Sequence, residues 1–216
     1  MTWSENPRHQ GLRKRLVDAL KIKGIRDERV LAAIGKVPRH AFLESTFINF
    51  AYRDQAFPIG AGQTISQPYT VAFQSELLMV EPYSKVLEVG TGSGYQAAVL
   101  CEMGAKVYTI ERQKELFVKA SQLLQELGYF PAFHFGDGFR GLPTYGPFDR
   151  IIVTAGATSV PEELKTQLVI GGRMVIPVGP DRHQEMLVVI RTGEEEYVTE
   201  KHGGFIFVPL LRGVIN

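Results

Sequence analysis

Residues 86–95 carry the most informative run of side chains in this chain, Val-Leu-Glu-Val-Gly-Thr-Gly-Ser-Gly-Tyr. Gly90, Gly92 and Gly94 follow a short apolar run with the spacing Gly-x-Gly-x-Gly, so the backbone there can turn tightly and approach a ligand closely. In an open parallel sheet such a loop joins the first strand to its helix, where ligands bind. A glycine loop alone does not identify the ligand, and its acidic neighbours have to be considered.

Three acidic residues are expected around this loop. Glu88 lies two residues before Gly90, Glu111 ends the next predicted strand, and Asp137 follows the third within Gly136-Asp137-Gly138. A carboxylate at Glu111 can accept both ribose hydroxyls of an adenosine, and one at Asp137 can accept from the adenine amino group. Glu88 suits a cationic amino-acid head group better than a phosphate. S-adenosylmethionine combines these features.

Other interpretations of the pattern stay open. Dinucleotide-binding loops carry Gly-x-Gly-x-x-Gly, which brings a helix N-terminus onto the pyrophosphate. The spacing found here, together with Glu88, disfavours a nicotinamide-dependent oxidoreductase without excluding it. Each acid taken alone could instead cap a helix or remain a solvated charge. A non-catalytic module that binds S-adenosylmethionine would also satisfy the pattern.

The elements that must position these residues alternate in type from Lys85 onward. Apolar runs predict strands at 86–89, 106–110, 132–135, 150–153 and 173–178, with helices through 97–100 and 116–127. This order predicts a three-layer, doubly wound, mostly parallel α/β sheet of the Rossmann-like kind. Residues 186–190, 197–201 and 205–208 are strand-like without an intervening helix, which predicts an antiparallel C-terminal edge.

The N-terminal part reads as a helical extension of the same domain. Periodic apolar residues predict two amphipathic helices between Arg8 and Lys36, an irregular stretch over 37–67, and a helix that begins near Pro68. We find no repeat or flexible linker, and therefore expect one domain over 1–216. Its extension is 1–80 and its cofactor-binding core 81–216.

Composition narrows the class of protein. The chain has 216 residues, a formal net charge of +1 and one cysteine, so no broad basic face for nucleic acid and no internal disulfide are expected. We expect no metal, because no Cys/His spacing suggests one, and no membrane partner, because no apolar run is long enough to span a bilayer. No secretory signal is visible. The sequence therefore predicts a cytoplasmic protein, with Cys101 packed behind the glycine loop.

Longer stretches of the chain resemble the protein-L-isoaspartate O-methyltransferase family over essentially the whole length. The resemblance is carried by 62–69, 90–95, 108–112, 136–138, 148–157, 168–179 and 207–210. The Thr64-Ile65-Ser66 and Val153-Thr154-Ala155-Gly156-Ala157 blocks are the most particular to that family. The resemblance implies a methyltransferase sheet with rearranged last strands. It also implies methyl transfer to the free carboxylate of L-isoaspartyl (or D-aspartyl) residues, whose ester then closes to a succinimide and begins protein repair.

The resemblance also implies roles for individual residues. Ser66 matches the active-site serine. The expected cofactor contacts are Thr64, Ile65, Ser66, Glu88, Gly90, Thr91, Gly92, Ser93, Gly94, Tyr95, Glu111, Arg112, Gly136, Asp137, Gly138 and Thr154. The expected substrate contacts are Ser66, Val208, Pro209 and Leu210. The cofactor would be S-adenosyl-L-methionine, leaving S-adenosyl-L-homocysteine, and the partners would be isoaspartyl proteins and peptides bound by a monomer. No role is carried over to Tyr69.

The chemistry of such a transfer asks little of the side chains. A carboxylate has a pKa of ~4 and is already an anion at neutral pH, so no general base is needed. A hydroxyl such as that of Ser66 can donate to the acceptor and orient it. Ser66 could instead simply cap the helix predicted at Pro68. Other methyltransferase classes fit less well, because the chain lacks an Asn/Asp-Pro-Pro-aromatic motif, a cysteine in a reactive loop and a carboxylate cluster after the fourth strand.

Overall fold

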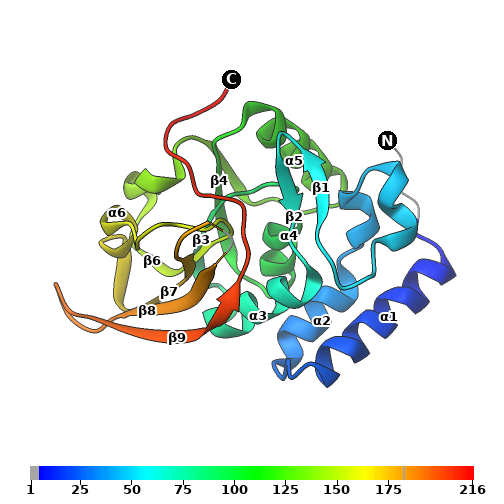
Figure 1. Cartoon of the computed structure of the whole chain (residues 1–216), viewed down its shortest axis with the longest axis horizontal. Coiled ribbons are helices and arrows are strands. Elements are labelled where there is room, and N and C mark those ends of the chain that lie inside the picture. Colours follow the sequence, from blue (N-terminus) through cyan, green and yellow to red (C-terminus); the bar gives the residue numbers. More distant parts are fainter. Residues whose placement is uncertain (1–4, 182) are drawn as a thin grey trace.

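The computed structural model describes residues 5–181 and 183–216, and its centre is a seven-stranded sheet (Figure 1). The strands are β3 (Lys85–Val89), β4 (Lys106–Glu111), β5 (Ala132–Phe135), β6 (Phe148–Val153), β7 (Leu168–Val178), β8 (Gln184–Arg191) and β9 (Tyr197–Phe205). Their spatial order is β5-β4-β3-β6-β7-β8-β9. The strand that leads into the glycine loop, β3, therefore lies between β4 and β6 in the middle of the sheet.

Strand directions confirm the expected mostly parallel sheet. β3 runs parallel to β4 and β6, β5 parallel to β4, and β7 parallel to β6. β8 is antiparallel to β7, and β9 is antiparallel to β8, so the C-terminal edge is antiparallel as predicted. The prediction of a further edge strand at 205–208 is wrong, because β9 ends at Phe205 and residues 206–208 form no strand.

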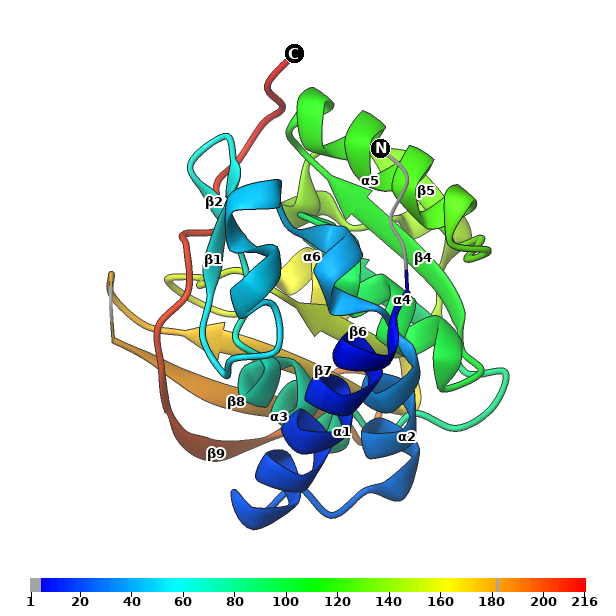
Figure 2. The same ribbon diagram turned by 90° about the vertical axis from the view of Figure 1, so that its right-hand side faces the viewer.

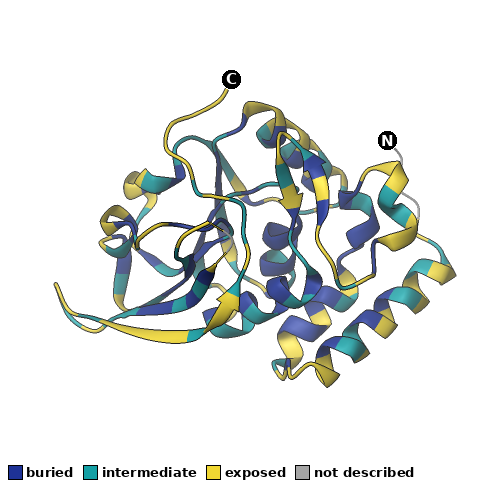
Figure 3. Cartoon of the chain, in the orientation of Figure 1, coloured by how far each residue is buried: buried dark blue, intermediate teal, exposed yellow. Residues whose placement is uncertain are grey.

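Helices cover one face of the sheet. α3 (Pro68–Leu78), α4 (Tyr95–Glu102) and α5 (Lys114–Glu126) bury Val71, Ala97 and Leu116 in one cluster with Ile152 of β6. The opposite face is covered by shorter elements: α6 (Glu162–Lys165) and the 3-10 turns η3 (Gly138–Arg140) and η4 (Pro143–Tyr145). Figure 3 shows the buried residues concentrated between these layers.

The two helices predicted in the N-terminal part are confirmed, and Figure 2 shows them outside the helical layer. α1 (Pro7–Ile22) begins after Asn6, whose side chain accepts from the backbone N–H of His9. α2 (Glu28–Lys36) begins after Asp27, whose side chain accepts from the N–H of Arg29. None of the described helices combines the length and the hydropathy that a membrane span requires.

The stretch predicted to be irregular contains structure that the sequence did not reveal. It forms two 3-10 turns, η1 (Arg39–Phe42) and η2 (Ser45–Phe50), and an antiparallel hairpin of β1 (Phe57–Gly60) and β2 (Gln63–Ile65). These elements are too short to show a periodic pattern. The hairpin places residues 64–66 directly before α3, and although α3 falls within the predicted 1–80 extension, it packs on the sheet.

Candidate active site

The glycine loop between β3 and α4 is closed by Thr154, which follows β6. Thr154 Oγ1 donates to the carbonyl of Gly90 at 2.6 Å, and Gly90 has a φ of 98°. A Cβ at Gly90 would lie 2.5 Å from that hydroxyl oxygen, and a Cβ at Gly94 (φ 87°) would lie 2.8 Å from Leu124 of α5. Both glycines are therefore required by a left-handed backbone and by close neighbours.

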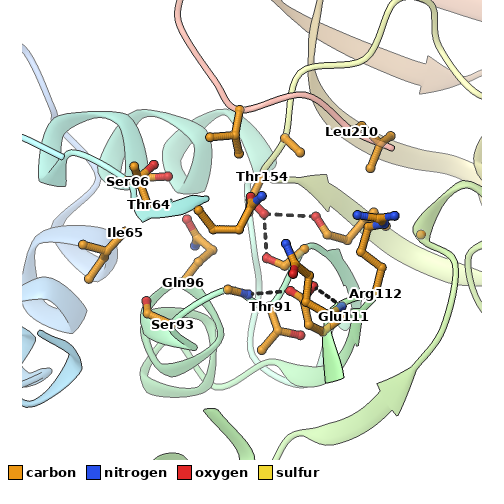
Figure 4. Close-up of a pocket in the computed structure, with 18 of the residues that line it drawn as sticks. Thr64, Ile65, Ser66, Thr91, Ser93, Gln96, Glu111, Arg112, Thr154 and Leu210 are labelled. Carbon is orange, nitrogen blue, oxygen red and sulfur yellow. Dashed lines mark hydrogen bonds between the residues drawn. The ribbon is translucent and has the colours of Figure 1, made fainter. Parts of the chain in front are cut away.

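A cavity opens at the carboxyl ends of β3, β4 and β6, as expected for a sheet of this topology. In Figure 4, Thr64 and Ser66 enter from one side, and Glu111, Arg112 and Leu210 lie on the other. The lining brings together most of the predicted site: Thr64, Ile65, Ser66, Gly90, Thr91, Gly92, Ser93, Tyr95, Glu111, Arg112, Gly138, Thr154, Val208, Pro209 and Leu210.

Glu111 is the acidic residue that lines the cavity, with 5% of its surface exposed. Its Oε2 accepts from the backbone N–H of Gly92 at 2.9 Å, and its Oε1 accepts from that of Gln113 at 2.8 Å. An ionised carboxylate has about four lone-pair positions, so each oxygen can accept one further hydrogen bond. Glu111 therefore has the acceptor capacity for two adjacent hydroxyls of a ribose.

Glu88 does not line the cavity, so the geometry does not support its expected contact with a cationic head group. Successive side chains of a strand point to opposite faces, so Glu88 shares the face of Val86, which packs in one cluster with α4, and it is fully buried there. Thr109 Oγ1 donates to Glu88 Oε2 at 2.5 Å and lies 2.5 Å from Thr91 Oγ1. Thr91 and Thr109 share a hydrogen bond in which either hydroxyl can donate. Glu88 thus supports the glycine loop through two threonines.

The charge state of Glu88 also differs from the expectation. Burial raises the pKa of this carboxyl to about 8, with a smaller contribution from the charge of Glu111, while the hydrogen bond from Thr109 opposes the rise. Glu88 is therefore mostly a neutral acid at pH 7. A buried neutral acid is a hydrogen-bond partner rather than a counter-ion.

Asp137 also lies outside the cavity lining. Its Oδ1 accepts from the N–H of Phe139 at 3.0 Å, and its Oδ2 accepts from the N–H of Gly213 at 2.8 Å. Gly136 and Gly94 do not line the cavity either. The geometry thus gives no support to the expected contact of Asp137 with adenine, and shows it holding the C-terminal segment instead.

The C-terminal segment 207–215, which we call the strap, closes one side of the cavity. Near its start, Gly156 donates to the carbonyl of Val208 at 2.8 Å, and Leu210 donates to the carbonyl of Gly156 at 2.7 Å. Val208, Pro209 and Leu210, the expected substrate contacts, line the cavity, as does Leu211. The strap therefore separates part of the cavity from solvent.

The far end of the strap is tied to residues just after β4. Arg112 donates through Nε to the carbonyl of Gly213 at 3.0 Å and through Nη2 to that of Arg212 at 3.2 Å. The backbone of Ile215 donates to Arg112 at 2.8 Å, and its carbonyl accepts from Lys114 at 2.9 Å. Arg112 lines the cavity and also latches the strap.

Sequence reasoning missed several lining residues: Gln63, Val71, Val89, Gln96, Ile110, Gln113, Ala155 and Leu211. Most are direct neighbours in sequence of predicted site residues, which was the available signal. Gln113 illustrates the difficulty, because its Nε2 donates to the carbonyl of Ala61 at 3.0 Å, a contact between distant segments.

The alternative that Ser66 caps α3 is not what the structure shows. Gln67 occupies the N-cap position and makes no side-chain capping bond, and Asp54 accepts from the N–H of Tyr69 at 2.7 Å. Ser66 instead lines the cavity. Its backbone carbonyl accepts from Arg39 at 2.8 Å.

Two other reactive groups lie away from the cavity lining. Burial raises the pKa of the Cys101 thiol to about 12, so this cysteine of α4 stays a packed thiol rather than a nucleophile. Among the described residues, Glu5, His9 and His40 place three potential metal ligands within 4.8 Å of one another. Arg13 already donates to Glu5 at 2.9 Å, so its charge opposes a second cation there, and we assign no metal role.

The fold and the cavity together define the class: a Rossmann-like α/β methyltransferase with a glycine loop after its first central strand and an acid after the next. The family model described as Protein-L-isoaspartate(D-aspartate) O-methyltransferase matches residues 11–214. The chain belongs to this family.

Individual relatives agree with this assignment. A protein-L-isoaspartate O-methyltransferase from Christiangramia forsetii is 60% identical over 205 residues, covering 94% of this chain and 96% of the relative. One from Dictyoglomus thermophilum is 46% identical over 207 residues, covering 95% and 94%. The likeness therefore extends over nearly the full length of both relatives.

Solved structures show the same fold. A protein-L-isoaspartate O-methyltransferase structure has a TM-score of 0.83 at 30% identity. The match covers 91% of this chain and 65% of that longer chain. A structure from Plasmodium falciparum, described as a complex with S-adenosyl-L-homocysteine, has a TM-score of 0.80 at 24% identity, covering 92% and 98%. At that identity the likeness concerns the fold.

Glu88 predicts a pH-dependent stability. Its pKa is 4.5 when unperturbed and about 8 in the folded state, so between these values the folded protein binds more protons than the unfolded chain. The free energy of unfolding then falls as the pH rises through this range, by on the order of a few kcal/mol. In Glu88→Gln this contribution is absent, and the difference between the wild type and Glu88→Gln should change with pH. Urea unfolding at pH 5 to 9 measures it.

The exposed residue Glu81 supplies the control, because Glu81→Gln should leave the pH dependence unchanged. Parallel stability curves for the wild type and Glu88→Gln would contradict the raised pKa.

The strap predicts a second measurable effect. Asp137, which does not itself line the cavity, binds the N–H groups of Gly213 and Phe139, and Asp137→Ala removes both contacts; Arg112→Ala removes the two contacts to Gly213 and Arg212. Each hydrogen bond to a charged group contributes about 1.5–3 kcal/mol, and about 1.4 kcal/mol corresponds to a factor of ten, so S-adenosyl-L-homocysteine should dissociate at least roughly tenfold faster from both variants. Stopped-flow displacement measures the rate.

The exposed Arg8 of α1 offers a matched control, since Arg8→Ala should leave the dissociation rate as in the wild type. If S-adenosyl-L-homocysteine is released faster from Arg112→Ala but not from Asp137→Ala, Arg112 acts by direct contact with the ligand. The strap is then no barrier to ligand release.

Proposed function

We propose that this chain transfers the methyl group of S-adenosyl-L-methionine to the free carboxylate of L-isoaspartyl and D-aspartyl residues in damaged proteins and peptides. The methyl ester then closes to a succinimide and begins repair. One observation carries the proposal: Ser66 lines the same cavity as Glu111 and the glycine loop, so a cofactor held by the loop would face a hydroxyl donor.

The residues present fit the cofactor. Glu111 keeps acceptor capacity for two ribose hydroxyls. The glycine loop keeps its close approach to Thr154 only because Gly90 has no Cβ, which would clash with the Thr154 hydroxyl. No phosphate-binding glycine spacing is present. When bound, S-adenosylmethionine supplies a methyl group on a positively charged sulfur, which a nucleophilic oxygen can accept.

The chain's own task is then to bind and orient the acceptor. An isoaspartyl carboxylate with a pKa of ~4 is an anion at neutral pH, so no base has to remove a proton. Ser66 can donate a hydrogen bond to one carboxylate oxygen and hold the other toward the methyl group. Orientation of this kind can contribute roughly 7–11 kcal/mol to lowering a barrier. Val208, Pro209 and Leu210 of the strap would contact the peptide and exclude water.

Further parts of the proposal concern the setting of the enzyme. We propose a cytoplasmic monomer that uses no metal and takes isoaspartyl proteins, not nucleic acid or membranes, as partners. The single cysteine and the net charge of +1 support it. A binding module without transferase activity is the alternative that shares the same cofactor chemistry.

The first test is substrate discrimination. Purified protein should transfer labelled methyl groups to a peptide with one L-isoaspartyl residue and not to the same peptide with aspartate, because only the former places its free carboxylate on the shorter branch. Base-labile radioactivity measures the product. Binding of S-adenosyl-L-homocysteine without transfer to either peptide would support the binding module, and equal transfer to both would reject the substrate assignment.

The second test concerns Ser66. In Ser66→Ala the acceptor loses its hydrogen-bond donor, and we expect kcat to fall roughly 10- to 100-fold while the affinity for S-adenosyl-L-homocysteine stays within about threefold. Steady-state kinetics and calorimetry measure the two quantities. Ser45→Ala, at an exposed serine of η2, is the control. An equal loss of turnover and cofactor affinity would make Ser66 a cofactor-binding or structural residue.

A further inference from the structure

Arg39, the first residue of η1, is a fully buried cation. No ion pair of Arg39 occurs among the residues that the structure describes. Its guanidinium donates instead to backbone carbonyls: Nε to Ala51 at 3.0 Å, and Nη2 to Ser66 at 2.8 Å and more distantly to Gln55 at 3.4 Å. Burial lowers the pKa of Arg39, yet an arginine stays charged at neutral pH.

This arrangement is costly for stability alone. An effective penalty of several kcal/mol attends the burial of an ion, and here no carboxylate in direct contact offsets it. Neutral side chains of similar size would fill the same space at lower cost. The contacts of Arg39 therefore point to a role in fixing the backbone segments that it binds. Of the three residues whose carbonyls it binds, Ser66 is the one that lines the cavity.

The same guanidinium lies against the cofactor side of the cavity. Its central carbon is 4.8 Å from the ring centroid of Tyr95, which is buried and begins α4 directly after the glycine loop. A cation over an aromatic face is attracted by the ring. Arg39 thus contacts both the backbone of Ser66 and Tyr95, the residue that follows the glycine loop.

The residues after Ser66 are held separately. Asp54 accepts from Gln67 Nε2 at 3.1 Å and from the N–H of Tyr69 at 2.7 Å, and it pairs with Lys23 at 2.5 Å. Asp54 therefore fixes the start of α3. The carbonyl of Ser66 is the point at which Arg39 fixes the serine itself.

We propose that Arg39 is a positioning residue for the methyl transfer: by binding the Ser66 carbonyl and packing on Tyr95, it sets the Ser66 hydroxyl relative to the glycine loop. The inference rests on the proposed function of Ser66. A lysine cannot replace Arg39 in this role, because its ammonium is a point charge that lacks the planar fork needed to reach Ala51 and Ser66 while stacking on a ring.

The test uses Arg39→Lys and Arg39→Gln in the full chain. The glutamine variant buries no charge and so guards against a loss of folding. Both should lower kcat with an isoaspartyl peptide by roughly tenfold or more, with the affinity for S-adenosyl-L-homocysteine within about threefold of wild type. Arg173→Lys is the matched control, since Arg173 donates to the carbonyl of Leu77 outside the cavity and should change only stability.

A double-mutant cycle separates positioning from general destabilisation. If Arg39 acts through the Ser66 hydroxyl, Arg39→Lys should lower kcat in the wild type but leave kcat of Ser66→Ala nearly unchanged. Multiplying losses would overturn the proposal and make Arg39 a structural residue. Wild-type levels of kcat in Arg39→Lys and Arg39→Gln would do the same.

The outcomes distinguish this proposal from the proposed function. Absence of methyl transfer by the wild type would reject the function itself. Transfer by the wild type with an unchanged kcat in Ser66→Ala would leave the function standing and reject the route from Arg39 through Ser66.

Discussion

Both oxygens of the Glu111 carboxylate accept backbone N–H groups, one from Gly92 in the glycine loop and one from Gln113 in the turn that leads to α5. This single side chain therefore joins the turns that follow β3 and β4, and it does so while lining the cavity. The geometry depends on β3 and β4 being parallel neighbours in register, with Val89 beside Ile110, so that both turns lie at the same edge of the sheet. Thr154, directly after β6, closes the loop from the other side.

Two segments distant in sequence complete this edge. The β1–β2 hairpin brings Ser66 to the cavity, where Arg39 binds its carbonyl. The strap runs from the end of β9 to the turns after β4 and β5, where Arg112 and Asp137 hold it. The central strands thus supply one rigid side of the cavity, while the other side is built from loops fixed by a few charged side chains. Such a division is common in enzymes, because a rigid scaffold positions loops that carry function.

The buried side chains of Glu88 and Arg39 hold loops in place through hydrogen bonds rather than through ion pairs. Glu88, with a pKa raised to about 8, accepts from Thr109, and Thr91 completes the chain to the glycine loop. Arg39 donates to backbone carbonyls without an ion pair among the described residues. Both groups lose hydration on folding, and both gain directional hydrogen bonds that hold a loop in one conformation.

Local patterns in the sequence determined much of this protein: the helices of residues 7–36, the parallel core strands, the antiparallel edge, and Glu111 and Ser66 at the cavity. These follow from periodicity, from glycine spacing and from a family resemblance that is itself carried by sequence. Only the tertiary structure decided that Glu88 faces α4, that Asp137 holds Gly213, and that Arg39 holds Ser66. Spacing along a strand shows which end an acid is near, but its face and partners depend on segments far away in the chain, whose approach no local pattern encodes.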